Sequence, residues 1–582
     1  MVDETELKRR RKEKEEQEEV VAKDEQVAVQ KIEKQKTQYE SLPKPLVIQY
    51  LILLRLINAF TVNTFFQPDE YFQSLEPAHQ FAFGYGDLTW EWIDQLRSFN
   101  YPFMFYLSFK LSDLLGFGDV GVLLMPKIFQ GVVSAISEFY LYTFSQKLFG
   151  NETLARAVLL LSVVSSFNWF CFTRTFSSTF ELNLTIIALN YWPWEFLQGQ
   201  KKTIDLSQLG KSLTFAALAV IVRPTNIFIW IVLGPYMLFK VSGLGNKLKI
   251  LGLAMVVGSV IFAINTAIDF YYYERLVFPI VNFVKFNVLN SFADFYGINS
   301  WHFHLTQSIP FILTSYLPFF IFGLVCGDFQ FKSLFLSVLA VNIGVFSLIT
   351  HKEFRFIYQL MPFLLVIAAQ GFYRFYKFST STDQASSSLI FPRWAGKVVI
   401  YAILIINLAL GVLLTQVQER GVIDVINFLK FNPDVDSIGF LTPCHSTPLQ
   451  SYLHRPDLNH KIWYLTCEPP SSSMMDPEIF TTESIKTTLA NYKDESDKFY
   501  DDPKSYLDIH FPPFNKQFRT KGRVYNYEWP THLVFFEALE PFMKNYLQNS
   551  KYEECDRFFN SYFHWDSRRS GDVVVYCKWP WE

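Results

Sequence analysis

The sequence Phe65-Phe66-Gln67-Pro68-Asp69-Glu70-Tyr71-Phe72-Gln73 places two neighbouring carboxylates directly after an apolar stretch, residues 46–66. That stretch is long enough to cross a bilayer as a helix, which needs about 20 residues. Acids at a membrane boundary, set among aromatic rings, mark a functional site more often than a solvated surface loop. The segment therefore predicts a membrane helix that leads into a chemically active loop, with Asp69 and Glu70 as candidate catalytic groups.

Composition extends this prediction to most of the chain. Half of the 582 residues are hydrophobic and only 18% are charged, with 61 Phe, 30 Tyr and 13 Trp among them. The middle of the sequence is a series of apolar stretches of about 20 residues, whereas a soluble protein shows shorter amphipathic periods. We predict an all-α polytopic membrane bundle with about 11 or more spans. The expected spans lie near residues 45–66, 119–149, 152–172, 176–197, 211–222, 225–241, 247–272, 308–326, 330–350, 355–376 and 396–417.

The charges divide the chain into three regions and assign each to a side of the membrane. Residues 1–42 are dense in Lys, Arg and Glu and lack the apolar core of a signal peptide, which predicts a disordered cytosolic tail. Residues 43–417 hold the spans, and alternation from a cytosolic N-terminus leaves the Lys- and Arg-rich loops in the cytosol. Residues 418–582 then form a luminal domain of α/β type, on the same side as the first loop, residues 66–118.

Cysteine placement agrees with an oxidising compartment for the C-terminal region. Four of the six cysteines lie there: Cys444, Cys467, Cys555 and Cys577. In a polar domain that faces a lumen, four cysteines predict two disulfides, whereas free buried thiols would be expected in the cytosol. The spacing leaves all three connectivities open.

The first loop, residues 66–118, is long compared with the other connections, and long loops usually carry function. Besides the two acids it holds His79, Trp90, Trp92 and Arg97, which are candidate substrate-binding residues. Its aromatic rings suit a segment that lies at the membrane interface. A partly desolvated carboxylate beside such a segment can deprotonate a hydroxyl that is brought to the membrane surface.

A second cluster, His351-Lys352-Glu353-Phe354-Arg355, lies between two apolar stretches on the same predicted side as the acids. Cations there oppose the positive-inside trend, and a bound lipid phosphate gives a reason, since Lys and Arg hold phosphate by charge-assisted hydrogen bonds. The alternative, snorkelling of helix-end side chains, explains one or two cations but not the whole cluster. Arg223 is a weaker candidate, because a lone Arg near a helix end can simply pair with an acid in the bundle.

The sequence contains no P-loop and no His-Glu-x-x-His motif, so neither a bound nucleoside triphosphate nor a zinc protease site is predicted. His302 and His304 have no third ligand at metal-like spacing, and no metal site is expected. Nothing predicts nucleic acid binding. An acid and a cation cluster of this kind indicate a phosphate-bearing lipid as the donor of a transferred group.

These residues stand in blocks that resemble a known family, the dolichyl-phosphate-mannose-dependent mannosyltransferases of GT-C type, and among them the GPI-anchor enzymes that add a third mannose. The blocks are Gln67 to Glu76 with His79, Phe83-Gly84-Tyr85-Gly86, Leu88 to Trp92, Leu96-Arg97-Ser98, Arg223-Pro224-Thr225, His351-Lys352-Glu353-x-Arg355-Phe356, Pro443-Cys444-His445-Ser446-Thr447-Pro448 and Leu465-Thr466-Cys467-Glu468-Pro469. The long block that begins at Gln67 and the two cysteine-containing blocks are more specific to the GPI enzymes, and the resemblance covers nearly everything after residue 40. Two positions depart from the family pattern: Phe72 stands where Trp is usual, and Phe354 where an acid is usual.

The resemblance implies a GT-C bundle whose large first loop carries the base, in a multi-pass protein of the endoplasmic reticulum membrane with a luminal active site. It implies transfer of mannose from dolichyl-phosphate mannose to a GPI precursor, giving an α1,2-linked third mannose by a single inverting displacement. Asp69 is then the base, with Glu70 as the runner-up, and His351, Lys352 and Arg355 surround the leaving phosphate. Side-chain cations can stabilise that phosphate, so no cofactor or metal is required.

Other functions stay open on the sequence alone. A luminal mannosyltransferase that acts on the fourth GPI mannose or on the N-glycan precursor would share the catalytic blocks. A transporter is the non-enzyme alternative, but transporters tend to show inverted repeats and helices broken at mid-membrane. The sequence shows no convincing internal repeat, and it gives no indication of an oligomeric state.

Overall fold

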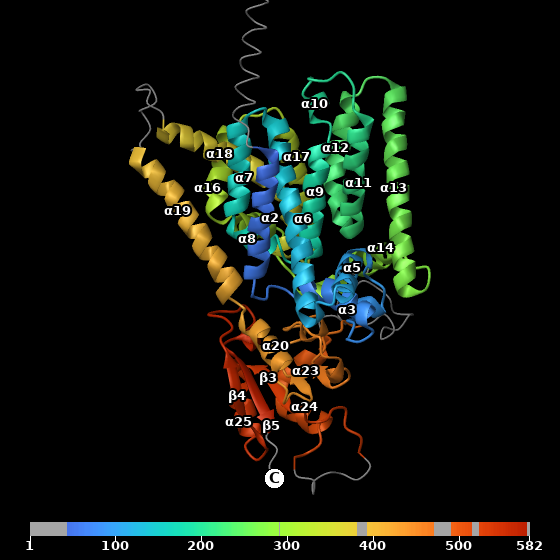
Figure 1. Cartoon of the computed structure of the whole chain (residues 1–582), viewed down its shortest axis with the longest axis vertical. Coiled ribbons are helices and arrows are strands. Elements are labelled where there is room, and N and C mark those ends of the chain that lie inside the picture. Colours follow the sequence, from blue (N-terminus) through green and yellow to red (C-terminus); the bar gives the residue numbers. More distant parts are fainter. Residues whose placement is uncertain (1–42, 290–291, 381–392, 471–490, 515–522, 579–582) are drawn as a thin grey trace, which may run out of the picture.

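The structure is a computed structural model that describes residues 43–289, 292–380, 393–470, 491–514 and 523–578. Most of these residues form helices that pack into a bundle, and the C-terminal region forms an α/β domain at one end of it (Figure 1). The predicted charged tail, residues 1–42, lies outside the described residues.

The apolar stretches become helices because a helix satisfies every backbone polar group within itself, as lipid requires. Each expected span contains at least one helix, and α11 and α12 are separated at Arg223-Pro224, because a proline cannot continue a helix. The helices of this region are α2 (Lys44–Thr61), α6 (Gly118–Phe149), α7 (Glu152–Val164), α8 (Ser166–Cys171), α9 (Ser177–Tyr191), α10 (Trp194–Leu197), α11 (Leu206–Val222), α12 (Ile227–Lys240), α13 (Leu244–Tyr273), α14 (Pro279–Val284), α15 (Ile309–Leu313), α16 (Leu317–Cys326), α17 (Lys332–Leu348), α18 (Met361–Thr380) and α19 (Arg393–Val412).

Length and composition support a membrane location for this bundle. Among the described residues, six helical segments are long and apolar enough to cross a membrane: Lys44–Thr61, Gly118–Phe149, Leu244–Tyr273, His304–Cys326, Phe354–Lys377 and Gly396–Phe431. Two further apolar helices, α11 and α17, are shorter. The structure thus bears out a helical protein with several candidate spans, and the count of about eleven stays a prediction.

The most buried of these segments contains α18, and two glycines bring its backbone against that of α16. A Cβ added to Gly323 or Gly371 would overlap the carbonyl oxygen of Ile367 or Phe319 in the facing helix. Small residues of this kind let membrane helices approach closely. Because α18 closely follows residues 351–355, its tight packing holds that cluster against the core.

The first loop is folded into short helices rather than left irregular. They are the π-helical turn η1 (Tyr71–Leu75), α3 (Glu76–Phe83), α4 (Trp90–Ile93) and α5 (Asn100–Leu114). Pro77 lies in the first turn of α3, directly after the π-helical turn, and Gly84 ends the helix with a φ of +80°. Figure 1 shows α3 and α5 where the bundle meets the C-terminal domain. The loop is therefore a structured layer between the two.

The C-terminal domain has the predicted α/β composition. Its five-stranded sheet has the order β2-β1-β3-β5-β4, in which β1 is parallel to β2 and β3, and β5 is antiparallel to β3 and β4. Its helices and strands are α20 (Gly421–Phe431), β1 (Ile438–Phe440), α21 (Gln450–Leu453), β2 (Ile462–Tyr464), α23 (Glu495–Asp501), α24 (Pro503–His510), β3 (His532–Phe536), α25 (Glu540–Tyr546), β4 (Tyr552–Phe558) and β5 (Val573–Lys578).

Both predicted disulfides are present, and the structure selects one of the three possible connectivities. Cys444 is bonded to Cys467, which joins the segments that follow β1 and β2. Cys555 is bonded to Cys577, which joins β4 to β5. The Cα atoms of the two pairs are 5.8 and 5.7 Å apart, a separation usual for disulfides.

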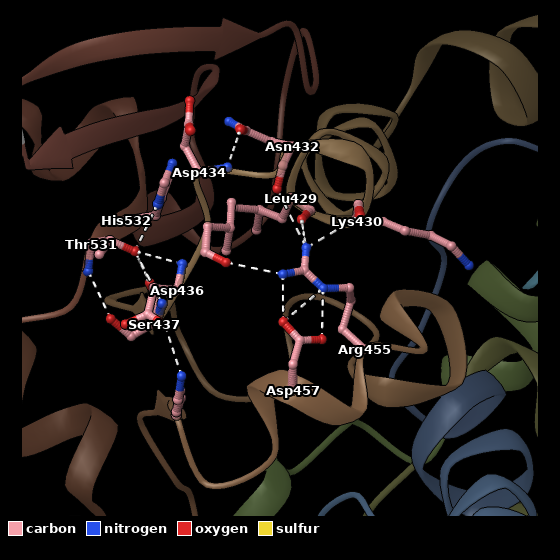
Figure 2. A network of polar contacts seen from close by, with 12 residues as sticks. Leu429, Lys430, Asn432, Asp434, Asp436, Ser437, Arg455, Asp457, Thr531 and His532 are labelled. Atoms are coloured by element: carbon pink, nitrogen blue, oxygen red, sulfur yellow. Dashed lines mark hydrogen bonds and ion pairs between the residues drawn. The ribbon is translucent and has the colours of Figure 1, made fainter.

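A polar network anchors the segment after α21 to the rest of this domain (Figure 2). The Arg455 guanidinium donates to three carbonyls at the end of α20, those of Leu429, Lys430 and Asn432. A cation at this position is favourable because the C-terminal end of a helix carries partial negative charge. Asp457, 2.6 Å from the guanidinium, balances its charge. The network fixes the neighbouring α21, which faces the first loop.

Candidate active site

The acidic turn follows the end of α2, and Pro68 sets its start. The backbone N–H groups of Tyr71 and Phe72 both donate to the Pro68 carbonyl, at 2.9 and 3.0 Å, so Asp69 and Glu70 lie in a helical turn. Successive residues of such a turn point about 100° apart. The two carboxylates therefore face different surroundings, although they are adjacent in the sequence.

Glu70 points into the protein. Its carboxylate is 2.8 Å from the Arg174 guanidinium, and the two side chains are 8% and 1% exposed. Arg174 also donates to the carbonyls of Thr64 and Phe170, and the Thr175 hydroxyl donates to the Glu70 carbonyl. Burial raises the pKa of Glu70, and the charge of Arg174 opposes that rise. These contacts tie the acidic turn to the segment between α8 and α9.

Asp69 points toward the predicted phosphate cluster. Its carboxylate lies 2.6 Å from Nη2 of Arg355, and 24% of its side chain is exposed. Nε of the same guanidinium donates to Glu353 at 2.5 Å, and Glu353 also contacts His351 at 3.2 Å. The fold thus joins two clusters that stand 286 residues apart in the sequence.

Glu353 and His351 shift each other's protonation. Burial raises the pKa of Glu353, but the charge of Arg355 and the hydrogen bond from His351 outweigh burial and hold the pKa well below its usual range. Burial lowers the pKa of His351, but the hydrogen bond and charge of Glu353 outweigh that effect and raise it above 6.5. Glu353 is therefore an ionised anchor for Arg355 and His351.

Two further guanidinium groups lie within electrostatic reach of Asp69 and Arg355. The charges of Asp69 and Arg355 act on Arg97, and those of Arg355 and Arg97 act on Arg223. Each has an acid of its own, since Arg97 pairs with Glu91 at 2.6 Å and Arg223 with Glu181 at 3.2 Å. Arg355 Nη1 is buried and has no hydrogen-bond partner within the described part of the chain. A buried donor without a partner is costly, so this nitrogen is suited to receive an anion.

Lys352 and Trp90 border the cluster. The Lys352 ammonium donates to the Asn299 carbonyl at 2.9 Å, so its charge is directed to the segment before α15. The Trp90 ring stacks on Tyr296, with the ring planes 8° apart. Both residues lie beside the 292–300 segment, and neither forms a hydrogen bond with Asp69 in the described structure.

His79 and Trp92, also predicted to bind substrate, make their contacts within the protein. The Trp92 indole donates to the Phe72 carbonyl at 2.8 Å. His79 Nε2 is hydrogen-bonded to His454 Nδ1 at 2.8 Å, and burial lowers the pKa of His79 to about 3. These contacts hold the loop and the C-terminal domain together and give no support to a role in substrate binding.

The C-terminal domain closes one side of the loop. The Glu76 carboxylate accepts hydrogen bonds from the backbone N–H groups of Leu449 and Ser451, at 2.8 and 3.1 Å, and from the Ser451 hydroxyl. Burial raises the pKa of Glu76 to about 7, although these hydrogen bonds act to lower it. The rings of Tyr71 and Tyr452 meet edge to face, with centroids 5.3 Å apart. The acidic turn is thus held from two domains.

Sequence reasoning assigned no separate role to Arg174 or Glu353. A signal for each exists in the sequence. Arg174 is a cation within a largely apolar region, where a charge needs a partner. Glu353 lies inside the cationic cluster, where an acid can pair with its neighbours. The partner of Arg174, in contrast, lies 104 residues away and no local pattern indicates it.

A carboxylate that faces a buried guanidinium at the end of a membrane helix bundle, beside a large structured first loop, fits a glycosyltransferase of GT-C type. The fold agrees: the chain matches the crystal structure of ArnT from Cupriavidus metallidurans bound to undecaprenyl phosphate with a TM-score of 0.51. The match covers 92% of this chain and 97% of that one at 11% identity, so it bears on the fold alone.

Sequence comparison identifies the family. Residues 46–454 match the Alg9-like mannosyltransferase family, and the chain belongs to it. A protein of Debaryomyces hansenii named GPI mannosyltransferase 3 is 42% identical over 93% of both chains. The proteins of that name from Candida albicans and Saccharomyces cerevisiae are 41% and 36% identical over 91% of this chain and 97% and 95% of theirs. The resemblance inferred from the motifs is confirmed, and the protein is a membrane mannosyltransferase.

Proposed function

We propose that this protein transfers mannose from dolichyl-phosphate mannose to a GPI precursor that carries two mannoses, and so adds the third, α1,2-linked mannose. The names of its relatives support GPI-anchor biosynthesis and the third transfer. The single structural observation that carries the chemistry is the Asp69–Arg355 contact, in which the guanidinium keeps a buried nitrogen free for an anion.

Asp69 takes the proton of the acceptor 2-hydroxyl while the acceptor oxygen forms a bond to C1 of the donor mannose. The bond from C1 to the phosphate oxygen breaks in the same step, its electron pair stays on the phosphate, and dolichyl phosphate leaves. A β-linked donor then gives an α-linked product. Arg355 Nη1 donates to the leaving phosphate, where a charge-assisted hydrogen bond strengthens as negative charge develops.

The other cations support the same anion from a greater distance. Glu353 raises the pKa of His351 and so favours its protonated form, and Arg97 and Arg223 act on Arg355 through their charges. With these groups the phosphate needs no metal for charge stabilisation, so we expect transfer to continue in the presence of EDTA. Loss of activity in EDTA that added Mg²⁺ or Mn²⁺ restores would contradict this part of the proposal.

The proposed location is the endoplasmic reticulum membrane, with the site on its luminal side. The Tyr71 ring of the acidic turn packs on Tyr452 of the domain that contains both disulfides, and disulfides form in oxidising compartments. A glycosylation sequon introduced at the exposed Asp434 should be glycosylated in cells, whereas one introduced at Lys202 should not. The reverse pattern would place the active site in the cytosol and contradict the donor assignment.

The acceptor assay decides the function. Purified protein is incubated with dolichyl-phosphate mannose and GPI precursors with one, two or three mannoses, and with an N-glycan precursor. We expect transfer to the two-mannose GPI precursor and a product that α1,2-mannosidase cleaves. Asp69→Asn should abolish transfer, whereas Asp94→Asn, an exposed acid of the same loop, should not. Transfer to another acceptor would reassign the enzyme within its family.

A further inference from the structure

The segment Pro443-Cys444-His445-Ser446-Thr447-Pro448 takes no part in the chemistry described above, yet the structure places it against the acidic turn. The His445 ring packs on Phe72, with ring centroids 4.5 Å apart, and the charge of Asp69 acts on His445. Phe72 belongs to the helical turn that contains Asp69. A histidine of the C-terminal domain therefore stands beside the catalytic turn of the membrane domain.

The backbone of His445 is held in an uncommon conformation. Its φ is +55°, in the left-handed region that residues other than glycine rarely adopt. The preceding residue, Cys444, is bonded to Cys467, and the Ser446 hydroxyl closes the turn on the Pro443 carbonyl. Such conformations persist where the surroundings enforce them, and they gather at functional sites.

The disulfide also determines which imidazole nitrogen carries the proton. His445 Nδ1 lies 3.6 Å from Cys467 Sγ, and a disulfide sulfur has no proton to donate. Nδ1–H is therefore the donor, and Nε2 is left as an acceptor. Burial lowers the pKa of His445 to about 4, so the ring is neutral near pH 7. Metals bind thiolates, so the oxidised cysteines do not form a metal site with this histidine.

Aromatic residues continue the same wall toward the first loop. The Tyr296 hydroxyl donates to the Cys467 carbonyl at 3.5 Å, and the Tyr296 ring stacks on Trp90. Within the described residues, His445 Nε2 has no protein partner. Aromatic rings beside a free acceptor nitrogen suit a sugar, which offers apolar C–H faces and hydroxyl donors.

We propose that His445 is a specificity-determining residue that binds the acceptor glycan, with Nε2 accepting a hydrogen bond from a hydroxyl of the terminal mannose next to the one that Asp69 deprotonates. This assignment rests on the proposed function. The cations of the membrane domain then hold the donor phosphate, and the C-terminal domain orients the acceptor. The Cys444–Cys467 disulfide is a positioning element, because it fixes both the backbone and the tautomer of His445.

The test separates acceptor from donor kinetics. His445→Ala should raise the acceptor KM about fivefold to tenfold, the loss of one hydrogen bond, with the donor KM unchanged. His445→Gln, whose side-chain oxygen can replace Nε2, should recover part of the loss. The wild type should use an acceptor that lacks the hydroxyl bound by His445 less well than the full acceptor. The His445→Ala variant should use the two acceptors equally well.

The disulfides provide a matched control. Replacing Cys444 and Cys467 by Ser should raise the acceptor KM, whereas replacing Cys555 and Cys577 by Ser should leave it unchanged, because that bond joins β4 to β5. Donor and acceptor KM values that rise together, or an acceptor KM that stays unchanged in both His445 variants, would overturn the inference. A wild-type enzyme that fails with the two-mannose precursor would instead refute the proposed function.

Discussion

Replacing each of the two adjacent acids by its amide separates structural support from chemistry. Glu70→Gln preserves the size of the side chain but removes the charge that faces Arg174, whose side chain is only 1% exposed. Breaking a buried ion pair by removing one partner costs about 3–5 kcal/mol, because a charge is left uncompensated. Arg174 keeps its hydrogen bonds to Thr64 and Phe170, so we expect a loss at the lower end, about 3 kcal/mol.

Asp69→Asn should instead change activity while leaving stability nearly intact. The Asp69 side chain is 24% exposed, and Arg355 keeps its second acid, Glu353, so the loss of stability should be about 1 kcal/mol or less. The amide cannot accept a proton, however. We therefore expect transfer to fall by about 100-fold to 10,000-fold, the range that general-base catalysis contributes.

Two measurements on each purified variant are sufficient: thermal unfolding followed by tryptophan fluorescence, and the initial rate per folded molecule. Glu70→Gln should unfold at a temperature lower by about 4 °C, because about 3 kcal/mol acts on a bundle of roughly 375 residues that gains about 2.1 cal/mol/K of entropy per residue on unfolding. It should keep substantial turnover. Asp69→Asn should unfold like the wild type and be inactive. A stable but inactive Glu70→Gln together with an active Asp69→Asn would refute this interpretation of both acids.

Three further predictions concern the cation cluster and the core. Arg355→Lys should raise the donor KM about tenfold to 100-fold, since a single ammonium nitrogen does not replace a planar guanidinium that contacts each acid through a separate nitrogen. An unchanged donor KM would assign Arg355 a purely structural role. Protonated His351 should favour donor binding at low pH, and this advantage should be lost as the pH rises through its raised pKa. Glu353→Gln should move that loss to lower pH, and a donor-KM profile that does not move would exclude His351 as the titrating group. Gly371→Ala should reduce stability by about 1–3 kcal/mol because its Cβ meets the backbone of α16, whereas Gly344→Ala, with open space around it, should not; equal melting temperatures would contradict the close helix contact.

The sequence was sufficient where local patterns decide structure. Apolar length predicted the helices and the boundary between residues 211–222 and 225–241, where α11 ends and α12 follows. Four cysteines predicted two disulfides. These features depend on residues that are close in the chain, so their physical cause can be identified from the sequence without knowledge of the fold.

Long-range contacts could not be predicted in this way. The partner of Asp69 lies 286 residues further on and that of Glu70 104 residues further on, and both acids carry the same charge. Lys352 and Arg355 likewise belong to one short cluster, yet Lys352 is directed toward Asn299 and Arg355 toward Asp69. Which nearby group enters the site depends on side-chain direction, which is set by the packing of α18 and of the segment before α15.

The different environments of Asp69 and Glu70 also bear on how loss of activity should be interpreted. A general base must stay within hydrogen-bond reach of the hydroxyl it deprotonates, and a displacement of about 1 Å can cost 100-fold in rate. Because Asp69 shares its turn with Glu70, and Glu70 is held by Arg174 in the core, any change that frees Glu70 also releases Asp69. A substitution that removes all contact with Arg174, such as Glu70→Ala, can therefore lower transfer as well, and loss of activity alone does not identify the base. The base is the acid whose amide variant keeps the stability of the folded protein while turnover is lost, and we expect this result for Asp69, because Arg355 keeps its second acid, Glu353, in the Asp69→Asn variant.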